Sequence, residues 1–89
     1  MRCVISVLGK DKSGIVAAIA NALAENDANI IDISQTILDD IFSMTMLISL
    51  GGESADFNAV QEALNKVGTE LKVQVTVQRE DVFHYMYEL

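Results

Sequence analysis

The spacing of apolar residues in the first third of the chain predicts a strand followed by a helix. Residues 3–8 form a short apolar run rich in β-branched side chains, which is typical of a strand buried on much of both faces. From 14 to about 26, apolar residues recur every three or four positions, which predicts an amphipathic helix. Ser13 precedes this helix, and we expect its hydroxyl to cap the first turn.

The middle of the chain changes to a period of two. Alternation over 29–38 and again over 41–50 predicts two half-buried strands, joined at Asp39-Asp40 by a two-residue turn. In the second of these strands, five apolar residues share one face: Phe42, Met44, Met46, Ile48 and Leu50. This hairpin is the clearest secondary-structure signal in the sequence.

The last third of the chain repeats the pattern of helix and strand. An apolar stripe over 57–67 predicts a helix, which Ser54 or Asp56 would cap at its start and Gly68 at its end. Apolar and polar residues then alternate over 71–78, which predicts a strand with one solvent-exposed face.

This order of elements predicts an α+β fold, a ferredoxin-like βαββαβ sandwich. Its four-stranded antiparallel sheet carries both helices on one face, and right-handed crossovers set the strand order as 4-1-3-2. Helical spacing over 79–89 adds a short C-terminal helix. The second strand lies at an edge of this sheet, which suits Asp32 and the hydroxyl residues beside it.

The face of the sheet opposite the helices is expected to be partly apolar. A thin domain is expected to cover such a face, either with its C-terminal tail or with a second copy of the chain, so we expect a homo-oligomer. The apolar residues expected there are Ile30, Leu38, Ile41 and Leu47.

Composition narrows the range of partners. The chain has 89 residues, which predicts one domain, and a formal net charge of −7. This charge disfavours nucleic acid and anionic membranes, which require a basic surface. A single cysteine excludes an internal disulfide, and with one histidine it makes a zinc site improbable. The sequence shows no signal peptide or membrane-spanning run, so we expect a cytoplasmic protein without a cofactor.

The segment 9–16 carries the candidate chemistry. It combines a tight turn, charges of both signs, a hydroxyl and the start of a helix. Unpaired amides of the first helical turn, from Gly14 to Val16, suit a carboxylate, and the missing side chain of Gly14 lets a ligand approach the backbone. Asp11 and the amide oxygen of Asn29 would accept hydrogen bonds from an ammonium group. Two alternatives stay open: Gly14 as simple helix-start geometry, and Asn29 as a partner of turn backbone.

Two stretches together suggest a family. The sequence Asp-Lys-Ser-Gly-Ile-Val at 11–16 stands before an alanine-rich helix, and Asn29-Ile30 opens the next strand. In both stretches the chain resembles the ACT domain, and it is similar to small stand-alone ACT proteins and to the ACT halves of the glycine cleavage system repressor. The resemblance implies an ACT-like domain over 1–78 and a helical tail over 79–89 that packs on the domain or on a partner subunit.

The resemblance also implies a function. ACT domains typically bind amino acids or similar small molecules between paired domains and regulate an attached or partnered enzyme. Ser13 stands where many members have proline, which implies a less rigid loop and affects the expected ligand affinity more than the fold. The candidate ligand-binding residues are Asp11, Ser13, Gly14, Ile15, Val16, Asn29 and Ile30.

Three other functions compete with a non-enzymatic amino-acid sensor. A ligand-free protein–protein adaptor would use the open sheet face and the tail. An enzyme of phosphate esters would want an arginine in the first loop, which holds only lysines. RNA binding would want exposed aromatic residues on the central strands and a positive charge. The sequence therefore favours the sensor and keeps the adaptor as its alternative.

Overall fold

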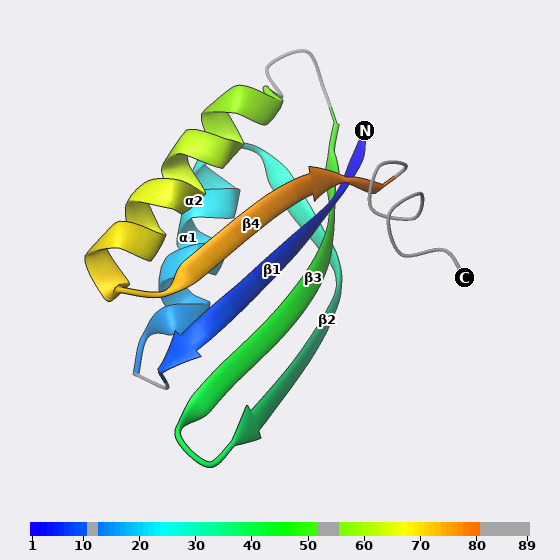
Figure 1. Cartoon of the computed structure of the whole chain (residues 1–89). Coiled ribbons are helices and arrows are strands. Elements are labelled where there is room, and N and C mark those ends of the chain that lie inside the picture. The colour runs from blue at the N-terminus through cyan, green and yellow to red at the C-terminus, as the bar shows by residue number, and fades with distance from the viewer. Residues whose placement is uncertain (11–12, 52–55, 81–89) are drawn as a thin grey trace.

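In the part of the chain that the structure describes, four strands and two helices form a two-layer sandwich (Figure 1). The computed structural model describes residues 1–10, 13–51 and 56–80. The elements follow in this order: β1 (Arg2–Lys10), α1 (Ile15–Glu25), β2 (Ala28–Leu38), β3 (Ile41–Leu50), α2 (Phe57–Leu71) and β4 (Gln74–Arg79).

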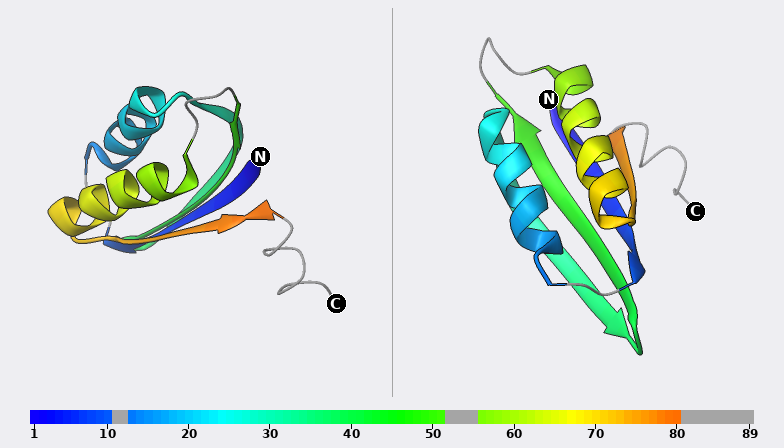
Figure 2. Two further views of the ribbon diagram at one scale, coloured as in Figure 1. Left: turned by 90° about the horizontal axis from the view of Figure 1, so that it is seen from above. Right: turned by 90° about the vertical axis from the view of Figure 1, so that its left-hand side faces the viewer.

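The strands form one antiparallel sheet in the order β2-β3-β1-β4, and both helices lie on the same face of it (Figure 2). The predicted βαββαβ fold and its strand order 4-1-3-2 are confirmed, because the observed order is the same one taken from the other edge. The predicted C-terminal helix over 79–89 lies outside the described residues except at its start, where Arg79 is the last residue of β4 and not part of a helix.

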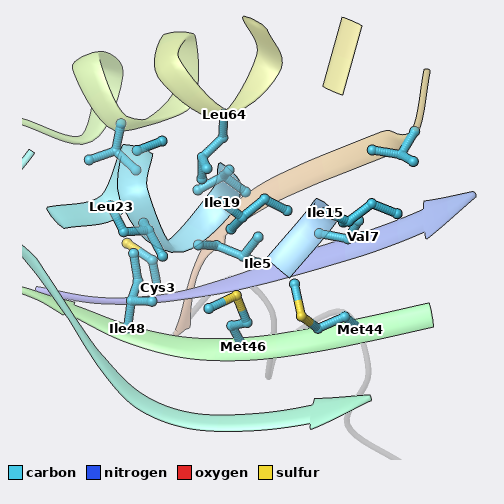
Figure 3. Close-up of a cluster of buried hydrophobic side chains, with 14 of the residues drawn as sticks. Cys3, Ile5, Val7, Ile15, Ile19, Leu23, Met44, Met46, Ile48 and Leu64 are labelled. Atoms are coloured by element: carbon cyan, nitrogen blue, oxygen red, sulfur yellow. The ribbon is translucent and has the colours of Figure 1, made fainter. Parts of the chain in front are cut away.

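The core lies between the helices and the two central strands. Figure 3 shows Met44 and Met46 of β3 on the same side as the helices, with Leu64 of α2 above the sheet. The alternation of β3 is confirmed, since its five predicted core residues, 42 to 50, are at most 5% exposed. Burying apolar side chains in this way is the main source of stability for a chain of this size.

The turn at Asp39-Asp40 joins β2 to β3 as predicted, with Leu38 paired to Ile41. Asp39 adopts a φ of 58°, in the left-handed region that aspartate tolerates better than most residues.

The predicted C-terminal cap at Gly68 is wrong. Helix α2 continues to Leu71, and Lys72, with a φ of 57°, ends it. The Val73 amide then donates to the Gly68 carbonyl at 2.9 Å, in the six-to-one pattern of a Schellman ending. Gly68 serves packing instead, because a Cβ there would meet the Val73 carbonyl oxygen at 2.9 Å. At the other end of α2, Asp56 is the cap, and its carboxylate accepts from the Asn58 amide at 2.9 Å.

The predicted half-burial of β2 is wrong over most of its length. Every residue from 31 to 38 is exposed, including Ile33 at 41% and Ile37 at 52%. Only the first residues of β2, Ala28 and Ile30, pack against the core. The helices therefore cover the start of β2 and leave the rest of the strand exposed to solvent.

A bulge explains why one open-face prediction fails. The register of β2 against β3 shifts between Ile30 and Asp32, so Ile31 is an extra residue. Ile30 pairs with the buried Ile48 and lies on the helix side, not on the open face. The register places Leu38, Ile41 and Leu47 on the open face, as predicted. Alternation predicts faces correctly only within an uninterrupted strand.

Candidate functional site

The start of α1 is built around Gly14. Gly14 is the N-cap with a φ of 89° and a ψ of −2°, a left-handed conformation that glycine adopts without strain. A Cβ there would meet nothing within 4 Å, so the conformation rather than the space calls for glycine. Ser13 is therefore not the cap that the sequence predicted. It is exposed in the preceding turn, and the described residues supply no side-chain hydrogen bond to this helix start.

The backbone of the first turn is available to an anion. The Ala18 amide donates to the Gly14 carbonyl at 2.9 Å, which is the first bond of the helical series. The amides before it have no partner within a regular helix and point out of its N-terminus, where the helix dipole is positive. Residues 15–18, all of them described, include no acidic side chain that would neutralise this end. The turn therefore offers what a carboxylate needs.

The side chains of this turn have a different role from its amides. Ile15 is 1% exposed and belongs to the core, and Val16 is half-buried against it. Both side chains fix the helix on the sheet, so any contribution to a ligand would come from their amides. Asp11, the predicted acceptor for an ammonium group, lies outside the described residues.

Asn29 and Ile30 lie at the other end of the domain. They follow α1, whose 11 residues span about 16 Å at the helical rise of 1.5 Å per residue. Asn29 is exposed and pairs with Ser49, so the register places its side chain on the open face of the sheet. A single chain therefore does not bring Asn29 and Gly14 together.

A cation that the sequence did not single out stands near the base of the first loop. Gly9 lies against Val73, where a Cβ on Gly9 would come within 2.7 Å of the valine side chain. This close approach brings the exposed Lys72 to the end of the sheet from which the loop departs. A lysine at a helix end is usually a solvated charge, and no sequence pattern marks Lys72 as anything else.

An open groove of about 360 Å³ lies between α1 and α2, but it is separate from these residues. It contains none of the predicted site residues and is mainly walled by small and charged side chains. The residues that line it are Ala18, Asn21, Ala22, Glu25, Ala63, Lys66, Val67 and Glu70.

Two kinds of feature are absent from the described residues. Within 1–10, 13–51 and 56–80, no three His, Cys, Asp or Glu side chains gather as metal ligands. In the same part of the chain, no helix is long and apolar enough to cross a membrane.

The fold, with a glycine-started helix open to solvent, is that of a small regulatory domain. The family profile described as ACT domain matches residues 2–78. The chain belongs to the ACT domain family, whose members are regulatory modules that commonly bind small molecules at interfaces and form oligomers.

Three relatives illustrate this membership. A UPF0237 protein from Methanocaldococcus jannaschii is 52% identical over 88 residues, covering 99% of this chain and 98% of its own. The structure of an ACT domain protein from Streptococcus pneumoniae matches with a TM-score of 0.80 at 41% identity, covering 98% of both chains. A structure described as a candidate glycine cleavage system transcriptional repressor matches with a TM-score of 0.77 at 26% identity, over 86% of this chain and 44% of its own.

Proposed function

We propose that this protein is a non-enzymatic regulatory module that binds an amino acid or a related small metabolite at an interface between copies of the chain. The observation that carries the proposal is the start of α1, where Gly14 leaves the first amides of the helix accessible. Membership of the ACT domain family supports the regulatory role.

The helix start would bind the carboxylate of the ligand. Amides of Gly14, Ile15 and Val16 would donate to it, and the positive end of the helix dipole would add to the attraction. Charge-assisted bonds of this kind are stronger than bonds between neutral groups. A glycine at this position also keeps the approach to the backbone clear.

The ammonium group would need acceptors that the helix start does not provide. Asp11 is one candidate, and Asn29 of a second copy is the other. Because Gly14 and Asn29 lie at opposite ends of one domain, a site that uses both requires two chains. This requirement links ligand binding to assembly, so a ligand would stabilise the oligomer by mass action. A partnered enzyme or regulator would then respond to the change in assembly.

Calorimetric titration of the protein against the common amino acids tests the proposal. We expect one ligand to bind, and Asn29→Ala to weaken its binding by about tenfold, the effect of losing one hydrogen bond to a charged group. Asn65→Ala, at an exposed position on α2, is the matched control and should bind normally. Absence of heat across the whole panel at millimolar ligand would exclude amino acids.

A protein–protein adaptor without a ligand remains the second candidate. The observation that favours it is the exposure of Leu38 at 73% and of Leu8 and Ile41 at about half on the open sheet face. Deleting residues 81–89 and measuring the mass in solution tests the contribution of the C-terminal tail. An unchanged mass would remove the tail from this hypothesis.

A further inference from the structure

The open face of the sheet is not uniform, and Val4 marks the end that differs. Val4 stands between Cys3 and Ile5, which Figure 3 shows on the side of the helices, so its own side chain lies on the opposite face. Val4 is only 7% exposed, yet it does not belong to the core cluster beneath the helices. Leu8, on the same strand and the same face, is 49% exposed. One end of the open face is therefore sheltered.

The neighbouring strands show the same difference between residues of one type. Ser49 of β3 is partly buried, whereas Ser43, on the same strand and face, is exposed. Gln78 of β4 is partly buried, whereas Gln74 is exposed. Because each comparison holds residue type, strand and face constant, the side chains themselves do not account for it. The sheltered patch, as we call this end of the face, consists of Val4, Leu47, Ser49 and Gln78.

The chain leaves the sheet beside the sheltered patch. Arg79, the last residue of β4, pairs with Cys3, and the backbone becomes helical at Glu80. The Glu80 carboxylate forms an ion pair of 2.9 Å with Arg2, whose pairing with Ser49 places it on the open face. The chain therefore leaves β4 toward the open face and not toward the helices.

We propose that residues 81–89 lie across the sheltered patch of their own chain, so that their apolar side chains cover Val4 and Leu47. The inference goes beyond the proposed function and needs no ligand. It divides the open face into an end that the chain itself closes and an end, around Leu8 and Ile41, that stays open to a partner.

The sequence of this segment suits the patch in pattern and in length. One side of a helix over these residues would be apolar and would include Val82, Phe83, Met86 and Leu89. Residues 81–89 in a helix span about 13 Å. Strand β3, which carries Leu47, is two strand spacings from β4, or about 10 Å, so the segment reaches it. Leu8 is about 13 Å from Val4 along the strand, which a helix about 10 Å wide over the patch would not cover.

Other segments fit the patch less well. Met1 lies at the same end of the sheet, but it is 59% exposed and bonds to the backbone of Leu50. Residues 52–55 have to join Gly51 to α2 on the opposite face of the sheet. A second copy is the remaining alternative, but β4 already ends at the patch, which favours the chain's own segment.

A double-mutant cycle in the full chain tests the contact. We expect Met86→Ala and Leu47→Ala each to lower the equilibrium constant for folding by about fivefold or more, because each truncates an apolar side chain that the contact buries. Since the two side chains would touch, the loss in the double variant should be at least about threefold smaller than the product of the single losses. Chemical denaturation followed by circular dichroism measures all three variants.

Two matched control cycles define the contact further. Leu8→Ala replaces Leu47→Ala in the first, because Leu8 lies at the exposed end of the same face. His84→Ala replaces Met86→Ala in the second, because a residue two positions away lies on the other side of a helix. We expect additive losses in both control cycles.

Crosslinking distinguishes the chain's own segment from that of a second copy. Leu47→Cys combined with Met86→Cys should react with a short bifunctional thiol reagent to give a product with the mass of one chain. Leu8→Cys combined with Met86→Cys is the control and should give no such product. The native Cys3 is 0% exposed, so it should not compete for the reagent.

The outcomes bear on this contact and not on ligand binding. Coupling between Met86 and Leu47, with crosslinking inside one chain, would support the proposal. Additive losses in that cycle would overturn it, and so would crosslinking between two chains, which would assign the patch to a second copy. Equal crosslinking from Leu8 and from Leu47 would also overturn it, because the segment would then have no preference for the sheltered end.

Discussion

Strands β2 and β3 are neighbours with similar alternating sequences, yet β3 buries one of its faces whereas β2 is exposed over most of its length. Met46 of β3 is 0% exposed, whereas Ile33, which faces it across the pair, is 41% exposed. The helices account for the difference, because they stand over β1 and β3 and reach only the first residues of β2. Alternation in a sequence therefore shows which side chains share a face, but not whether another layer covers that face.

The largest expected difference in stability is between truncations of the two paired side chains, Met46 and Ile33. Met46→Ala should lower the free energy of unfolding by about 2–5 kcal/mol, the range for a large-to-small change in a core. Ile33→Ala should lower it by less than about 1 kcal/mol, because much of that side chain is already in water. Chemical denaturation, extrapolated to low protein concentration to remove any effect of association, measures both. Equal losses at the two positions would show that β2 is covered in the monomer.

A smaller effect is expected where α2 touches the sheet. Gly68→Ala places a Cβ 2.9 Å from the Val73 carbonyl oxygen, and the strain should exceed the gain in helix propensity, leaving a net loss of about 1–2 kcal/mol. Gly51→Ala, at the end of β3 with nothing within 4 Å, should change stability by less than about 0.5 kcal/mol. Thermal unfolding distinguishes the two. A stabilised Gly68→Ala would mean that the helix can move away from β4.

A substitution in the turn between β2 and β3 should lower the free energy of unfolding by about 1 kcal/mol. In Asp39→Ala, alanine would have to adopt the same left-handed conformation, which it tolerates less well than aspartate. We therefore expect this variant to be less stable than the wild type by about 1 kcal/mol. Asp40→Ala, whose backbone does not require a positive φ, is the control and should be nearly neutral. Denaturation midpoints of the two variants provide the measurement, and a neutral Asp39→Ala would show that the turn relaxes to another type.

The smallest effect is expected on the open face. Leu38 is 73% exposed, so Leu38→Ser should change the free energy of unfolding by less than about 0.5 kcal/mol. A loss above about 1 kcal/mol would show that the full chain covers this face in solution, with its tail or with a second copy.

The fold was predictable because its main signals are local and agree with one another. The β-branched run of β1, the hairpin around Asp39 and the apolar stripes of both helices each point to one element, and short connections then limit the topology. Three details were not predictable. The bulge at Ile31 shifts Ile30 to the helix side, the close approach of α2 to β4 uses Gly68 inside a helix, and the extent of helix cover determines the exposure of β2.

The candidate site was predictable in part. Gly14 stands out in the sequence because it follows Ser13 at the start of the predicted helix, but its left-handed conformation, with a φ of 89°, is a finding of the structure that the sequence did not predict. The expectation for Ser13 failed because a left-handed glycine can begin a helix without a side-chain cap. The separation of Gly14 from Asn29 was predictable, because the helix predicted over 14–26 stands between them and is confirmed as α1.

The pairing of β1 with β4 has a consequence for how the chain folds during synthesis. The first strand pairs with the last one, with Cys3 opposite Arg79, and an ion pair of 2.9 Å between Arg2 and Glu80 closes the same end. One edge of β1 therefore stays without its partner until β4 has also left the ribosome. Contacts so distant in sequence form late and slow folding, and an open edge of a nascent strand invites aggregation. A chain that stopped before Gln74 would keep β1 at an edge, which makes the last six-residue strand a requirement for solubility as well as for stability.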